Sequence, residues 1–184
     1  MFSKKKRTGP EIIAPLIDEK VGAIIRYAHL YSGFFYGRLA NEFADFKDVT
    51  DDYSMAFMEL FTVAAIGVSL HSPSLLESGA YLSVISSAQS QLDNYFEHSH
   101  NKLSEILIDY IQFEKKHTNE LISMGYNFSE IPAYWLLHNL NTYKDFFKNQ
   151  ILMSMLGNEL TNHFIHVLED TWKPKELDPT TLLN

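Results

Sequence analysis

The sequence contains no cysteine, and this absence removes several kinds of chemistry at once. Without thiols the chain has no disulfide bonds, no thiolate zinc site, no iron–sulfur cluster and no cysteine nucleophile. A chain of 184 residues is long enough to bury a sizeable core without covalent cross-links. A fold that needs no disulfide fits a reducing compartment, so we expect a cytoplasmic protein.

Long uninterrupted apolar runs are also absent. The most apolar stretch, residues 55–70, contains Glu59 and is shorter than the ~20 residues that a helix needs to cross a bilayer. Residues 12–17 are apolar, but Pro15 interrupts them and the run is too short for the core of a signal peptide. We therefore expect neither a transmembrane segment nor a targeting segment.

The motifs of several enzyme classes are missing. The eight glycines are scattered singly, which excludes a glycine-rich phosphate loop. Neither the Gly-x-Ser-x-Gly motif of serine hydrolases nor the His-Glu-x-x-His motif of zinc proteases occurs. With no nucleophile in an identifiable context, the sequence favours a protein that is not an enzyme and predicts no cofactor.

The charge is unevenly distributed along the chain. The formal net charge is -8, although four basic residues stand together in the run Lys4 to Arg7. An acidic body repels phosphate, so nucleic acid is an unlikely partner. The basic run is typical of a solvated chain end, with weak contact to a membrane or to nucleic acid as the alternative.

Helical periodicity without any strand pattern predicts an all-α, single-domain bundle of five or six helices. We assign residues 1–17 to a flexible basic arm, 18–173 to the bundle and 174–184 to a tail. Residues from about 52 to 70 are apolar nearly all round, which predicts the central helix of the bundle, capped by Asp51 or Asp52. A third helix follows the break at Pro73 and continues to Phe96, and a fifth begins at Ser129, with an apolar stripe that reaches Ile151 and a kink or break at Gly157.

One pattern indicates a metal site. Glu114 and His117 have the Glu-x-x-His spacing that places both side chains on one helix face, as in di-metal bundles. Glu59 on the central helix and His163 on the last helix could complete a set that binds iron, manganese or zinc. The alternative for Glu59 is a structural hydrogen bond with a histidine or tyrosine.

The aromatic residues give a second indication of function. The chain has 13 Phe and 10 Tyr, more than one small core obviously needs. The first helix carries four large residues in addition to its core stripe: Tyr27, Leu30, Tyr31 and Phe34. Contiguous exposed apolar surface is typical of a site that binds a partner.

We therefore interpret the chain as a helical protein-interaction module that binds a protein partner or a second copy. An adaptor, a small acidic chaperone and a subunit of an assembly all fit this description. The alternatives are the metal-binding bundle and a helical domain whose methionine and aromatic residues line a cavity for an apolar ligand.

Overall fold

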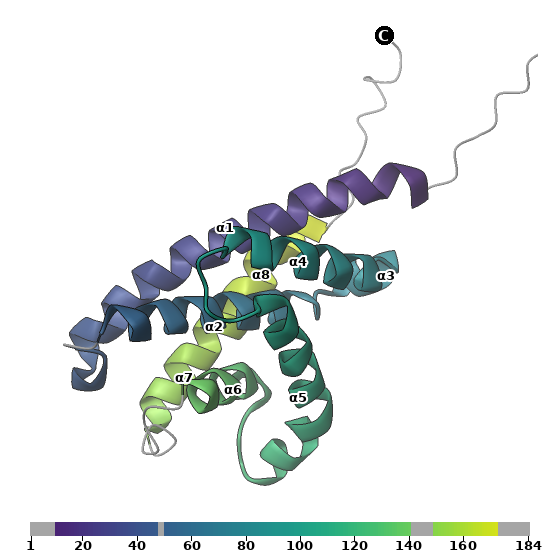
Figure 1. Ribbon diagram of the computed structural model, residues 1–184. Coiled ribbons are helices and arrows are strands. Elements are labelled where there is room, and N and C mark those ends of the chain that lie inside the picture. The colour runs from purple at the N-terminus through teal and green to yellow at the C-terminus, as the bar shows by residue number, and fades with distance from the viewer. Residues whose placement is uncertain (1–9, 48–49, 141–148, 173–184) are drawn as a thin grey trace, which may run out of the picture.

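The computed structural model describes residues 10–47, 50–140 and 149–172. Within these ranges the chain forms seven helices, six of them with at least seven residues, and no strand, which confirms the predicted all-α bundle (Figure 1). The helices are α1 (Pro10–Glu42), α2 (Asp51–Ser69), α3 (Pro73–Ser78), α4 (Tyr81–Tyr95), α5 (Leu103–Ser123), α6 (Ile131–Asn139) and a last, continuous helix made of α7 (Gln150–Asn158), a π-helical turn (Glu159–His163) and α8 (Phe164–Trp172).

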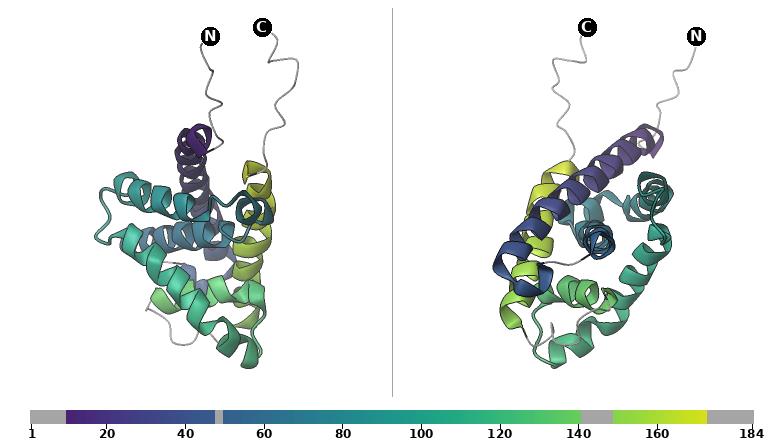
Figure 2. Two further views of the ribbon diagram at one scale, coloured as in Figure 1. Left: turned by 90° about the vertical axis from the view of Figure 1, so that its right-hand side faces the viewer. Right: turned by 60° about the vertical axis from the view of Figure 1, so that its left-hand side comes forward.

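The central helix α2 forms the middle of the bundle, as its composition predicts. Every residue from Glu59 to Leu70 is buried, and Phe57 and Phe61 are fully covered. Helices α1, α5, α6 and α8 all pack against it, and the right-hand view of Figure 2 shows the surrounding arrangement. The cap is Thr50, whose hydroxyl accepts a hydrogen bond from the Tyr53 N–H, so the prediction of an aspartate cap is wrong.

The first helix, α1, is longer than predicted. It begins at Pro10, so residues 10–17, which we assigned to a flexible arm, are helical. Pro15 suggested an interruption, but the helix continues through it. One side of α1 is buried against α2 and α4, and includes Val21, Ile25 and Phe35. The basic run from Lys4 to Arg7 lies outside the described residues.

A glycine divides the predicted third helix into α3 and α4. Gly79 has φ +69°, in the left-handed region that favours glycine, and it ends α3. Pro73 is the first residue of α3, and Gly125 follows the end of α5 with φ +96°. The predicted course of the fifth helix through Tyr143 and Phe147 falls on residues 141–148, outside the described part of the chain.

The last helix lies beside α1, and this arrangement positions the candidate site. Gly157 allows the close approach of α7 to the turn before α6, because a Cβ atom there would lie 2.5 Å from the Ser129 carbonyl oxygen. Immediately after it the backbone widens into the π turn, a feature often found at functional sites. Among the described helices, none has the length and hydropathy needed to span a membrane.

Candidate functional site

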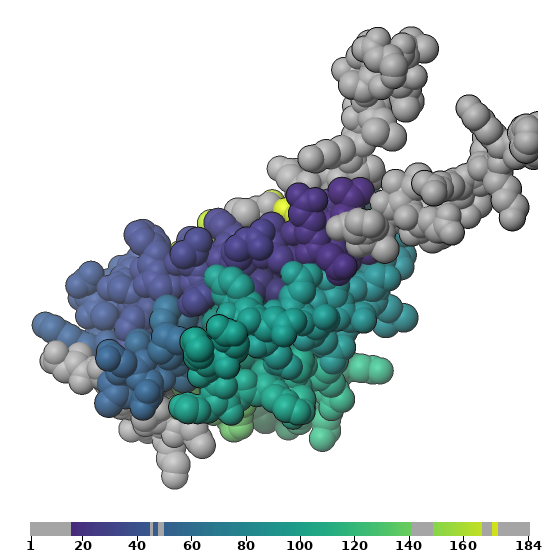
Figure 3. All heavy atoms as spheres, turned by 45° about the horizontal axis from the view of Figure 1, so that its top comes forward, coloured from purple at the N-terminus to yellow at the C-terminus, as the bar shows by residue number. Residues whose placement is uncertain are grey.

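The four residues predicted to bind a partner lie together on the outer side of α1. We call Tyr27, Leu30, Tyr31 and Phe34 the aromatic surface. The side chains of Leu30 and Phe34 are 74% and 73% exposed, and that of Tyr27 is 37% exposed. Tyr31 is half-buried. Figure 3 shows α1 (purple) along the outside of the molecule.

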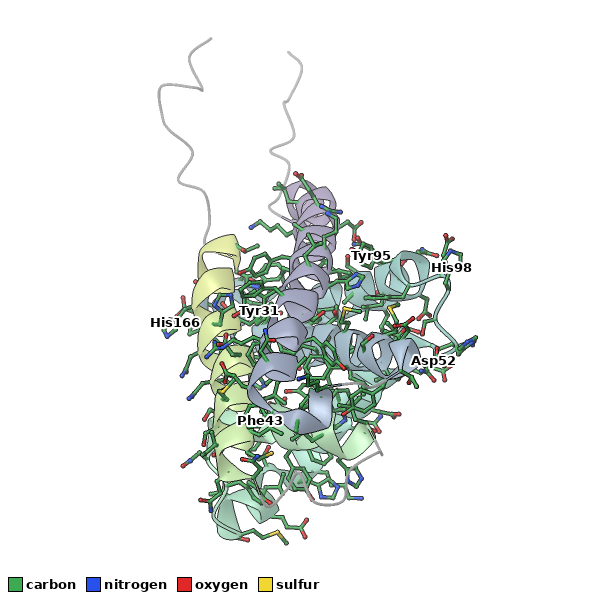
Figure 4. The ribbon with its side chains drawn as sticks, turned by 90° about the vertical axis from the view of Figure 1, so that its left-hand side faces the viewer. Tyr31, Phe43, Asp52, Tyr95, His98 and His166 are labelled. Atoms are coloured by element: carbon green, nitrogen blue, oxygen red, sulfur yellow. The ribbon has the colours of Figure 1, made fainter. Side chains whose placement is uncertain are left out.

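Tyr31 lies between α1 and the last helix, where it is held by the π turn (Figure 4). Its hydroxyl donates a hydrogen bond to the Glu159 carboxylate, and the His163 ring stacks on its ring with centroids 4.4 Å apart. Burial and the neighbouring Glu159 raise the pKa of Tyr31, so the hydroxyl stays protonated and remains a donor. The ring is therefore fixed by both stacking and a charge-assisted hydrogen bond.

Two further contacts complete this network. The Tyr27 hydroxyl and the His163 Nε2 atom are 2.7 Å apart and form a hydrogen bond. The Arg38 guanidinium donates to Glu159 at 3.3 Å and to Glu42 at 3.0 Å. Glu159 and His163 stand at the two ends of the π turn, so a single turn of the last helix positions both polar partners of the tyrosines.

The predicted metal-binding set does not assemble. His117 lies 3.1 Å from Glu120, one turn along α5, and not beside Glu114. His163 binds Tyr27, whereas Glu59 is buried on α2 near His29, where its charge opposes the lowering of the His29 pKa by burial. In the described part of the chain, no group of three or more His, Asp or Glu side chains could hold a metal ion.

Glu114 does face inward, as its helical position predicts, but its partner is His71 at the end of α2. The His71 Nε2 atom is 2.8 Å from the Glu114 carboxylate. Hydrogen bonding to Glu114 raises the pKa of His71. Nothing in the local spacing indicated the pairing, because His71 lies in the turn after α2, Glu114 lies on α5, and the two residues are 43 positions apart.

The clefts do not favour the apolar-ligand alternative. One of about 380 Å³ lies between the end of α5 and α7 and is lined by Asn127, Glu130 and Ser154 among others. Another of about 490 Å³ lies between the start of α1 and α4 and is lined mainly by serines. Both open to solvent and carry polar side chains, unlike the enclosed apolar pocket that such a ligand requires.

Comparisons with known proteins add no family to this description. No family model matches the chain, and neither a curated protein nor a solved structure matches it.

Proposed function

We propose that this chain is a helical protein-interaction module that acts in the cytoplasm and binds a protein partner through the aromatic surface of α1. The observation that carries the proposal is the exposure of Leu30 and Phe34, at 74% and 73%. They are one helical turn apart and flank the half-buried Tyr31. A Phe side chain can bury about 150–250 Å² in a contact, so a partner that covers these residues gains substantial apolar burial.

The network behind the surface supports the same proposal. Tyr27 and Tyr31 are fixed by His163 and Glu159, so the rings need little reordering when a partner docks. Preorganisation of this kind lowers the entropy loss on binding. An apolar centre next to a polar border of Arg38 and Glu159 is also the composition expected of an interface, in which a few large residues dominate the affinity.

The charge of the chain favours a protein over a nucleic acid as the partner. The net charge of -8 repels a phosphate backbone. Arg38, which shares Glu159 with Tyr31, is already paired with Glu42 and Glu159. The surface is therefore apolar and nearly neutral, which fits an apolar helix or groove on another protein.

The test compares two variants that carry new charges at similarly exposed positions. The double variant Leu30→Glu and Phe34→Glu places carboxylates in the centre of the surface. The control Ile151→Glu changes a side chain on α7 that is 72% exposed. We expect the double variant to lose partners that co-purify with the wild type and the control to retain them, with all three melting within a few degrees of one another. Equal partner recovery by the double variant would contradict the proposal.

A further inference from the structure

The exposed positions on the outer face of α1 are regularly spaced, and they extend beyond the aromatic surface in both directions. Positions separated by alternating steps of four and three residues are exposed, apart from the half-buried Lys20. We call this row the heptad seam; its members are Leu16, Lys20, Ala23, Tyr27, Leu30, Phe34, Gly37 and Asn41. Such spacing keeps a stripe of side chains facing a neighbouring helix in a coiled coil. The seam lies on the side of α1 away from α2 and α4, and at one edge Lys20 and Tyr27 also contact Trp172 and His163 of the last helix.

The seam indicates that the partner element is a helix. The large residues Tyr27, Leu30 and Phe34 occupy its middle, and the polar residues Lys20 and Asn41 lie towards its ends. Small residues, Ala23 and Gly37, leave gaps on either side of this middle section. Large side chains from a facing helix fit into gaps of this kind, as knobs fit into holes.

We propose that the facing helix is α1 of a second copy, packed antiparallel along the heptad seam; this rests on the proposed function and names its partner. In the antiparallel register Phe34 faces the partner's Ala23, and Tyr27 faces the partner's Leu30. Lys20 faces the partner's Gly37. The Phe34–Ala23 and Lys20–Gly37 layers each combine a larger side chain with a smaller one, and the two-fold axis that relates the copies passes between the two Tyr27–Leu30 layers at the middle of the seam.

A parallel pair of the same helices fits poorly. It would place Phe34 against the partner's Phe34 and Gly37 against the partner's Gly37, so that overfilled layers at the large residues would lie beside empty layers at the small ones. It would also bring the two Lys20 ammonium groups together. The antiparallel register keeps these two residues about 25 Å apart along the helix axis, at 1.5 Å per residue.

The charge of α1 permits the approach of two acidic chains. Between Leu16 and Glu42 the helix has as many basic as acidic residues. The basic residues are Lys20, Arg26 and Arg38, and the acidic residues are Asp18, Glu19 and Glu42. The chain as a whole carries -8. Two copies that meet along α1 therefore repel each other less than two copies that meet through a face with excess acidic residues.

The size of the seam sets the expected affinity. The strip is about 37 Å long and about 10 Å wide, given the rise and diameter of an α-helix. The area of this strip is smaller than the ~800 Å² that each partner buries in a standard stable interface. The proposed dimer is therefore expected to be a transient complex. We expect a dissociation constant of about 10–100 μM.

Disulfide trapping tests both the partner and its direction, because the chain has no cysteine of its own. Lys20→Cys and Gly37→Cys are made as separate proteins of different mass, mixed at a concentration above the expected dissociation constant and oxidised. Gly37 tolerates a side chain, since a Cβ atom there meets nothing within 4 Å. We expect the mixed disulfide to exceed either homodimer by about tenfold, because bonding needs Cα atoms within about 7 Å.

Each other result overturns the inference. Homodimers from either variant alone would show a parallel pair. Sedimentation equilibrium of the wild type could show a dimer while neither this cysteine pair nor Ala23→Cys with Phe34→Cys forms a mixed disulfide. That combination would place the dimer contact on another face. A wild-type protein that stays monomeric at several hundred micromolar would exclude self-association. The proposed function is tested separately, by partner recovery with the Leu30→Glu and Phe34→Glu double variant.

Discussion

Single hydroxyl groups hold the aromatic surface in place. Tyr31 donates to Glu159 on the side facing the last helix, whereas Tyr27 is more exposed and forms a hydrogen bond with the ring of His163. Hydrogen bonds to a charged group contribute more to stability than neutral ones, and exposure weakens both. The two tyrosines therefore differ in what their hydroxyls contribute, although both rings stack on the same histidine.

Removing each hydroxyl separately tests this difference. Tyr31→Phe keeps the ring and removes one of the two donors to Glu159, the other being Arg38, so we expect a loss of about 1–3 kcal/mol in the free energy of unfolding. Tyr27→Phe should lose less than about 1 kcal/mol, since this hydroxyl lies near solvent. Urea denaturation followed by circular dichroism measures both. Equal losses in the free energy of unfolding would show that the hydrogen bond to Glu159 contributes no more to stability than the bond to His163.

His71 predicts a pH dependence of stability. The hydrogen bond with Glu114 raises the pKa of His71 in the folded state above its ordinary value of about 6.5. The folded protein therefore binds this proton more tightly than the unfolded chain does. The resulting stabilisation is fully present below pH about 6.5 and is lost as the pH rises through the folded-state pKa.

The variant His71→Gln isolates this contribution. We expect the stability difference between wild type and variant to shrink between pH 5.5 and pH 8.5, a window that spans the ordinary histidine pKa of about 6.5. Denaturation curves at the two pH values measure it. Subtracting the variant removes the opposite effect of His29, whose pKa is lowered by burial. A difference that stays constant or grows with pH would contradict the pairing.

At the scale of elements, the contact between α2 and α5 depends on a glycine. A Cβ atom at Gly67 would lie 2.1 Å from the Cε1 atom of Tyr110. The Tyr110 ring cannot move away easily, because it is fully buried and packs edge-on against Trp135 with centroids 4.9 Å apart. The two helices thus approach closely at the one position where α2 has no side chain to separate them.

We expect Gly67→Ala to destabilise the fold by about 1–3 kcal/mol, as overpacking of a core does. Gly37→Ala is the matched control, because that glycine also lies inside a helix but meets nothing within 4 Å. There the substitution should stabilise by about 0.5–1 kcal/mol through the backbone entropy of glycine. Thermal unfolding of both variants provides the comparison. Stabilisation by Gly67→Ala would show that α5 shifts away at little cost.

The elements also show how far the sequence alone could go. Residues 52–70 are apolar on every side, and this pattern predicts α2 within one residue of its observed ends, Asp51 and Ser69. The break at Gly79 was missed, because an isolated glycine inside a helical pattern is usually tolerated. Its left-handed φ depends on how α3 and α4 pack, which spacing along the chain does not contain.

The candidate site was also predictable only in part, because spacing along one helix does not show what other helices bring to it. Helical spacing on α1 identified Leu30 and Phe34 as surplus to the core stripe, and both are exposed. The partners of Tyr31 come from the π turn, and a π turn widens the helix without a marker in the sequence. Glu-x-x-His spacing fixes only the face of one helix, not the groups that other helices bring to it, so it did not reveal that Glu114 pairs with His71.

Over the whole molecule, the outer face of α1, which we propose binds a protein, is supported from two sides. Helices α2 and α4 pack behind α1, and the π turn fixes its tyrosines from the side. Site-specific photo-cross-linking in cells tests this proposal. The photoreactive residue p-benzoylphenylalanine replaces Phe34 in one protein and Ile151 in the other, because both side chains are similarly exposed.

We predict a discrete protein adduct from position 34 and none of comparable yield from position 151. The mass of the adduct identifies the partner, and an adduct of twice the chain mass would show a second copy. Discrete adducts from position 151 alone, or none from either position, would contradict the assignment of α1 as the binding face.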